Sequence, residues 1–123
     1  MARQHGAGFV SLVNHAKLQI PEVTVEQVLQ MQVDSVSFVM VDVREDSEWS
    51  AGHVAGAVHL GKGIIERDIE TAIPDKETLI VLYCGGGFRS ALAAQSLHEM
   101  GYTNAVSMDG GWRGWNGANG AVS

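Results

Sequence analysis

The sequence predicts an α/β domain with three layers, in which helices cover both faces of a mostly parallel central sheet of about five strands. Residues 36–43 and 78–83 are β-branched and apolar with little polar alternation, which is typical of strands buried on both faces of a parallel sheet. Residues 90–100 instead place apolar side chains on one face of a helix. Because the expected strands and helices alternate along the chain, the α/β class is favoured.

The N-terminal part, residues 1–21, is expected to form a loose arm followed by a short helix. Apolar side chains recur at helical spacing within residues 8–18, and Pro21 ends this helix. Thr24 and Gln27 then have the spacing of a capping box, which predicts a second short helix directly after them.

The remaining elements follow from short apolar stretches and turn-forming residues. They are expected in this order: helical turns at 45–51 ended by Gly52, an extended piece within 53–60, a helix at 64–72 closed by Pro74, a last strand at 104–108, and a turn at the glycine pair 110–111. Ser90 is expected to cap the helix that follows it, and Gly101 to end that helix. We expect the folded domain to span residues 22–118, with a frayed tail at 119–123.

Length and composition exclude several classes of protein. A chain of 123 residues fits one domain, and 46% apolar residues are enough to fill its core. The net charge of −6 argues against a nucleic-acid-binding surface, and no apolar run approaches the ~20 residues of a membrane span. Because the start of the sequence lacks the continuous apolar stretch of a secretory signal, we expect a cytoplasmic protein without nucleic-acid or membrane partners.

The single cysteine, Cys84, lies at the position where α/β folds place their ligand-binding and catalytic residues. One cysteine excludes an internal disulfide. Cys84 follows the predicted strand 78–83, and ligands of open α/β sheets bind beyond the carboxyl ends of the strands. Three glycines follow it, so their N–H groups can turn inward, and the next helix points its positive end at the same place. Together with the charge of Arg89, this setting favours a thiolate that is nucleophilic near neutral pH.

Two simpler interpretations of this loop are open from the residues alone. A lone cysteine is often an inert buried side chain, and the glycines would then serve only a tight turn. A phosphate-binding loop is the other, but CGGGFRS has neither the spacing of the dinucleotide fingerprint nor the lysine of the mononucleotide loop.

Three blocks of sequence, in order, resemble the rhodanese-like domain family of thiosulfate sulfurtransferases. They are VDVREDSEWSAGHVAGAVHL at 41–60, IVLYCGGGFRSALAA at 80–94 and GYTNAVSMDGGWRGW at 101–115. The resemblance covers about residues 22–115. It implies a five-stranded α/β/α domain whose catalytic cysteine corresponds to Cys84.

The resemblance also implies a mechanism and a set of site residues. The Cys84 thiolate would take the outer sulfur of a donor such as thiosulfate, become a persulfide, and pass the sulfur to cyanide or a thiol. Donor and acceptor are expected to be small molecules, or alternatively a protein persulfide or thiol, and no cofactor is expected. The loop expected to bind the persulfide consists of Gly85, Gly86, Gly87, Phe88, Arg89 and Ser90.

The same fold leaves two alternative functions. One is a non-catalytic rhodanese-like sulfur carrier or binding module. The other is a phosphatase or arsenate reductase, whose loops in this family carry one more residue. Because only four residues separate Cys84 from Arg89, the loop length favours sulfur transfer over phosphate or arsenate chemistry.

Several further polar residues are candidates for supporting roles. Asp42 and Arg44 share one side of a strand end, where they would lie under the loop or form an internal ion pair, and Glu48 could join them structurally. Lys62 and Arg67 are candidates for contact with the anionic end of the donor, with solvated surface charge as the alternative.

No metal site is expected from the sequence. The histidines His5, His15, His59 and His98 lack the spacing of metal ligands. His53 could pair with a thiol, but the resemblance implies that it anchors a turn.

Overall fold

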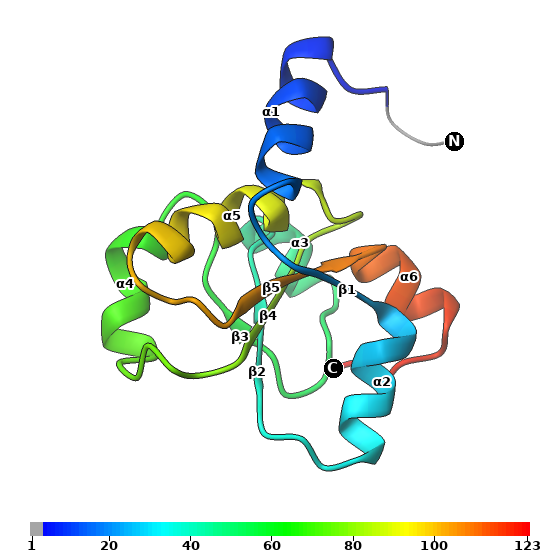
Figure 1. Ribbon diagram of the computed structural model, residues 1–123. Helices are drawn as coiled ribbons and strands as arrows, with labels where there is room; N and C mark the ends of the chain where they lie inside the picture. Colours follow the sequence, from blue (N-terminus) through cyan, green and yellow to red (C-terminus); the bar gives the residue numbers. More distant parts are fainter. Residues whose placement is uncertain (1–3) are drawn as a thin grey trace.

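A sheet of five parallel strands forms the centre of the computed structural model, which describes residues 4–123 (Figure 1). In chain order the strands are β1 (Glu22–Thr24), β2 (Val39–Asp42), β3 (Val58–His59), β4 (Ile80–Tyr83) and β5 (Ala105–Asp109). Their order across the sheet is β1-β5-β4-β2-β3, and all neighbouring strands run parallel. The predicted α/β class and the number of strands are therefore confirmed.

Helices lie on both faces of this sheet. Those of residues 4–123 are α1 (Ala7–Lys17), α2 (Val25–Val33), α3 (Asp46–Ser50), α4 (Ile65–Ala72), α5 (Phe88–Glu99) and α6 (Gly111–Gly117). Helices α1, α4 and α5 contribute to one hydrophobic cluster, whereas α2 and α6 contribute to a second one. Within the described part of the chain, no helix is long and apolar enough to cross a membrane.

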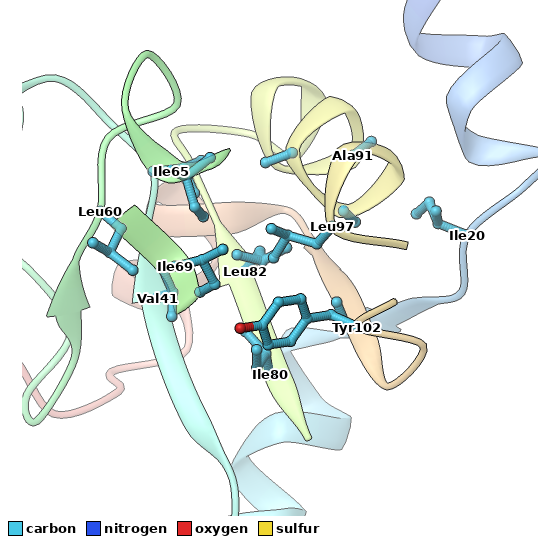
Figure 2. Packing of buried hydrophobic residues seen from close by; sticks show 14 of the residues in the cluster. Ile20, Val41, Leu60, Ile65, Ile69, Ile80, Leu82, Ala91, Leu97 and Tyr102 are labelled. Atoms are coloured by element: carbon cyan, nitrogen blue, oxygen red, sulfur yellow. The ribbon is translucent and has the colours of Figure 1, made fainter. Parts of the chain in front are cut away.

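Strand β4 shows why both faces are covered. Its four residues are all buried, and their side chains alternate between the two hydrophobic clusters. Ile80 and Leu82 pack with Leu97 of α5 in the first cluster (Figure 2), whereas Val81 and Tyr83 belong to the second. Burial of each such side chain contributes about 1.5–3 kcal/mol to stability, so β4 is held firmly from both sides.

The starts of two helices test the predicted caps. The capping box before α2 is confirmed: the Gln27 N–H donates to Thr24 Oγ1 at 3.1 Å, and the Thr24 N–H donates to Gln27 Oε1 at 2.8 Å. The predicted cap of α5 is wrong. This helix begins at Phe88 after Gly87, and Ser90 lies inside its first turn with a buried hydroxyl 2.8 Å from that of Ser107.

The C-terminal tail, which we expected to be frayed, makes backbone contacts with a distant segment. Residues 53–55 exchange hydrogen bonds with residues 121–123, and Val54 and Val122 form an antiparallel bridge. Gly120 N–H also donates to the carbonyl oxygen of Trp115 at 2.9 Å. The tail is mostly exposed, but several of its backbone groups are hydrogen-bonded to the rest of the fold.

The carboxyl ends of the central strands meet at one edge of the sheet. Asp42, the last residue of β2, is in register with Tyr83, the last residue of β4. Helix α5 starts only a few residues beyond Tyr83. The segment between them, which contains Cys84, is therefore a short loop at the edge where ligands of parallel sheets bind.

Candidate active site around Cys84

Cys84 lies directly after β4 and is almost completely buried, with 1% of its surface exposed. Its Sγ atom accepts a hydrogen bond from the Gly87 N–H at 3.1 Å. The hydroxyl of Ser90 lies 3.6 Å from the same sulfur. The loop therefore curls around the sulfur atom and presents hydrogen-bond donors to it.

The curled loop depends on glycine at particular positions. Gly87 has φ of +109°, a conformation that L side chains rarely adopt, and a Cβ atom there would lie 3.3 Å from the backbone of Asp109. Gly111, with φ of +52°, lies against the carbonyl oxygen of Cys84, so that a Cβ atom would overlap it. The glycine loop and the glycine pair before α6 are thus packed backbone to backbone.

Backbone hydrogen bonds join these two segments. The N–H groups of Gly110, Trp112 and Arg113 donate to the carbonyl oxygens of the loop, at 3.3 Å to Gly86, 2.7 Å to Cys84 and 3.2 Å to Gly85. Because the loop carbonyls are satisfied from outside, the loop N–H groups remain directed at the sulfur atom.

The environment of Cys84 favours its thiolate. Burial disfavours the charged form, but hydrogen bonds from the Ser90 side chain and from the N–H groups of Ser90, Gly87 and Gly86 outweigh burial. The net effect lowers the pKa of Cys84 below its ordinary value. A lower pKa increases the share of the thiolate, which is the nucleophilic form of cysteine.

Ser90 is itself held by a residue that the sequence argument missed. Its hydroxyl lies 2.8 Å from the hydroxyl of Ser107 in β5, and both side chains are fully buried. The available signal was a polar residue inside a buried strand, since burying a hydroxyl is costly unless it has a partner.

Arg89 does not offer a free positive charge. Its Nη1 and Nη2 atoms donate to the two carboxylate oxygens of Glu48, at 2.7 and 3.1 Å. This hydrogen-bonded pair is the main cause that lowers the pKa of Glu48 to about 2. The pKa of Arg89 is raised, first by Glu48 and further by the nearby Cys84 thiolate. Glu48, expected to support Asp42 and Arg44, thus positions Arg89 instead.

Asp42 and Arg44 form the buried internal ion pair that was one of the two expectations for them. Arg44 Nη2 donates to Asp42 Oδ2 at 2.7 Å and to the carbonyl oxygen of Gly52 at 2.7 Å. Burial raises the pKa of Tyr83, so its hydroxyl stays protonated and donates to the same Asp42 oxygen at 2.7 Å. This network ties the segment after β2 to the end of β4, beneath the loop.

A pocket of about 860 Å³ opens above Cys84. It is lined by residues of the N-terminal segment, the α3 region, the glycine loop and α6: Gln4, His5, Gly6, Phe9, Glu45, Glu48, Cys84, Gly85, Gly86, Phe88, Arg89 and Arg113. The rings of His5 and Phe9 lie 4.9 and 5.9 Å from that of Phe88, centroid to centroid. No local pattern in the sequence marked the N-terminal segment as a wall of this pocket.

Lys62 and Arg67, the candidates for donor contact, do not line this pocket. Lys62 is exposed, and Arg67 is paired with its neighbour Asp68, with Nε 2.7 Å from Oδ1. His53 does not line it either; its Nδ1 lies 3.0 Å from the carbonyl oxygen of Trp49, and the two rings are stacked. Among residues 4–123 there is no cluster of three or more side chains that could hold a metal ion.

Comparisons with known proteins agree with this geometry. The family model described as Rhodanese-like domain matches residues 24–118. The thiosulfate sulfurtransferase GlpE of Pseudomonas entomophila (strain L48) is 34% identical over 97 residues, which are 79% of this chain and 85% of that protein.

Two solved structures extend the comparison. A protein of unknown function from Rhodopseudomonas palustris CGA009, RPA3614, described as a possible tyrosine phosphatase, superposes with a TM-score of 0.87 at 26% identity. It covers 100% of this chain, and this chain covers 99% of it. The human single-domain sulfurtransferase TSTD1 has a TM-score of 0.70 at 25% identity, covering 79% of this chain and 96% of TSTD1.

Proposed function

Because the chain belongs to the rhodanese-like domain family, we propose that it is a sulfurtransferase in which Cys84 carries the transferred sulfur as a persulfide. The observation that carries this proposal is the buried Cys84 sulfur at the centre of a loop whose N–H groups and Ser90 hydroxyl favour its thiolate. The similarity to a thiosulfate sulfurtransferase supports the same chemistry.

The reaction has two half-reactions. In the first, the Cys84 thiolate attacks the outer sulfur of thiosulfate; a new S–S bond forms, the S–S bond of the donor breaks, and its electron pair leaves with sulfite. In the second, cyanide or a thiolate attacks the outer sulfur of the persulfide and releases the Cys84 thiolate. Since the chain has one cysteine, no second thiol of its own can take the sulfur, and the acceptor must be external.

The residues around Cys84 have separate roles in this scheme. The N–H groups of Gly86, Gly87 and Ser90 and the Ser90 hydroxyl hold the negative charge, first on the thiolate and then on the persulfide. Arg89 lies close to the sulfur, and its ion pair with Glu48 holds it in place and offsets its charge. We expect thiosulfate or another sulfane sulfur as donor and a small or protein thiol as acceptor, in the reducing cytoplasm, where a lone thiol stays free.

Mass spectrometry of the intact protein tests the proposal. After incubation with thiosulfate, the mass should rise by one sulfur atom, and cyanide should return it to the starting value. The variant Cys84→Ser should show no adduct. An unchanged mass of the wild-type protein, or an adduct that persists in Cys84→Ser, contradicts the proposal.

A phosphatase activity is the second candidate, because RPA3614 is described as a possible tyrosine phosphatase. The four residues between Cys84 and Arg89 make a loop one residue shorter than that of the phosphatases in this family, which leaves less room for a tetrahedral oxyanion. We therefore expect no turnover of an aryl phosphate. Hydrolysis that is lost in Cys84→Ser would favour the phosphatase over the sulfurtransferase.

A further inference from the structure

One cationic side chain lies at the mouth of the Cys84 pocket and has no part in the machinery described above. Arg113 belongs to α6, and its backbone N–H is anchored to the carbonyl oxygen of Gly85. Its guanidinium extends back over the glycine loop: a Cβ atom on Gly86 would overlap Nη2 of Arg113, and one on Gly85 would lie 3.5 Å from Nη1. The absence of side chains at both glycines makes room for this guanidinium.

The charge of Arg113 differs from that of Arg89. A Cβ atom on Gly85, 3.5 Å from Nη1 of Arg113, would also lie 3.2 Å from Nη2 of Arg89. Both guanidinium groups therefore border the same small volume next to Cys84. Arg89 is neutralised by Glu48, whereas Arg113 forms no ion pair with any of residues 4–123. Glu45 and Glu48 line the same pocket as the two arginines, and Glu48 is the one of them that pairs with Arg89.

We propose that Arg113 binds the anionic group of the sulfur donor and thereby makes the site selective for anionic donors such as thiosulfate. The proposal rests on the proposed sulfurtransferase function. Arg113 holds the sulfonate end, with Arg89 on its other side, while the outer sulfur faces Cys84. A guanidinium is suited to this task because it presents several N–H donors to an oxyanion and stays charged at every working pH.

The two half-reactions allow a specific test. In a double-displacement reaction, kcat/KM for the donor reports only persulfide formation, and kcat/KM for the acceptor reports only its discharge. With dithiothreitol, which carries no charged group besides its reacting thiolate, as acceptor, Arg113→Gln should lower kcat/KM for thiosulfate about ten-fold and leave kcat/KM for dithiothreitol within about two-fold. Arg113→Lys should recover part of the loss.

Lys76→Gln is the matched control, because it removes one positive charge from a surface lysine that pairs with Glu70 and does not line the pocket. It should leave both constants unchanged. If Arg113→Gln and Lys76→Gln change kcat/KM for thiosulfate equally, only the net charge matters and the proposal fails. Equal losses in both half-reactions of Arg113→Gln would also overturn it, since they would indicate damage to the loop.

A second variant tests the position of the guanidinium. Gly86→Ala should displace the flexible end of Arg113 and lower kcat/KM for thiosulfate in the wild-type background, and its further loss in the Arg113→Gln background should be clearly smaller. Additive losses would mean that the methyl group acts on something other than Arg113. The wild-type mass increase with thiosulfate separates the two proposals: without it the sulfurtransferase function fails, and with it only the role of Arg113 is at stake.

Discussion

Glu48 and Arg89 determine, at the scale of single residues, how much charge lies beside the glycine loop. Glu48 has a pKa of about 2 in the folded protein, against an ordinary value of 4.5, chiefly because Arg89 donates two hydrogen bonds to its carboxylate. Between these two pH values the unfolded chain binds more protons at this site than the folded chain. The stability that the pair contributes is therefore present above about pH 4.5 and is lost as the pH falls toward 2.

We expect Glu48→Gln to unfold more easily than the wild type at about pH 6, by about 1 kcal/mol, since the pair is partly exposed and screened by solvent. This difference should shrink at about pH 3, because Glu48 is protonated there in the unfolded chain but still largely ionised in the folded one. Urea unfolding at both pH values measures it. Glu66→Gln, which changes an exposed glutamate, is the control. A difference that is the same at both pH values would show that the charge of Glu48 does not stabilise the fold.

At the scale of the element, the glycine loop is a strand-to-helix connection that directs its N–H groups at the Cys84 sulfur. The positive φ of Gly87 directs its N–H at the Cys84 sulfur, and its lack of a side chain lets the loop pass close to the backbone of Asp109. The start of α6 holds the loop from outside through three backbone hydrogen bonds. Most contacts of the Cys84 sulfur therefore come from backbone groups of the loop. Where the loop passes close to another segment, as Gly87 does beside Asp109, only glycine fits.

The variant Gly87→Ala should lose about 1–3 kcal/mol of unfolding free energy, because alanine is strained at this φ and crowds Asp109. Persulfide formation should also slow, since the Gly87 N–H would turn away from the sulfur. Gly63→Ala is the matched control: nothing lies within 4 Å of a Cβ atom there, and its φ is not positive. Thermal unfolding and the rate of the mass increase measure the two effects. Equal behaviour of both variants would argue against a special role for Gly87.

The N-terminal helix belongs to the fold at the scale of the whole molecule, although the family match begins only at residue 24. Helix α1 lies next to α5, the helix that follows the glycine loop (Figure 1). Its side chains Val13 and Ala16 are buried. The Nζ atom of Lys17 lies over the ring of Phe88, 5.2 Å from its centroid, and forms a cation–π contact between α1 and α5. The helix thereby holds His5 and Phe9 against the loop and closes one side of the pocket.

Truncation of a buried side chain on α1 should therefore destabilise the whole domain. We expect Val13→Ala to lower the unfolding free energy by about 1–3 kcal/mol through lost burial and a residual cavity. Leu12→Ala, one residue earlier and 54% exposed, should change it by less than about 0.5 kcal/mol. Denaturant unfolding of both variants compares them. Similar small effects would mean that α1 is only loosely attached.

The local parts of the site could be predicted from the sequence because they are contiguous. A buried strand, a cysteine, three glycines and a helix follow one another within residues 78–100, so their order alone places the sulfur at the sheet edge. The same reasoning does not locate the cations that line the pocket. Lys62 and Arg67 follow a recognisable block of sequence, but the fold carries them away from the pocket, and α6 brings Arg113 there instead.

The sequence by itself determined the α/β class, the place of Cys84 at the end of a buried strand and the short glycine loop after it, since these depend on periodicity and on neighbours along the chain. Only the tertiary structure decided that Arg89 is neutralised by Glu48, that Ser107 supports Ser90, and that an N-terminal helix walls the pocket. These partners come from segments tens of residues apart. Their meeting depends on sheet order and helix packing, which no local pattern encodes.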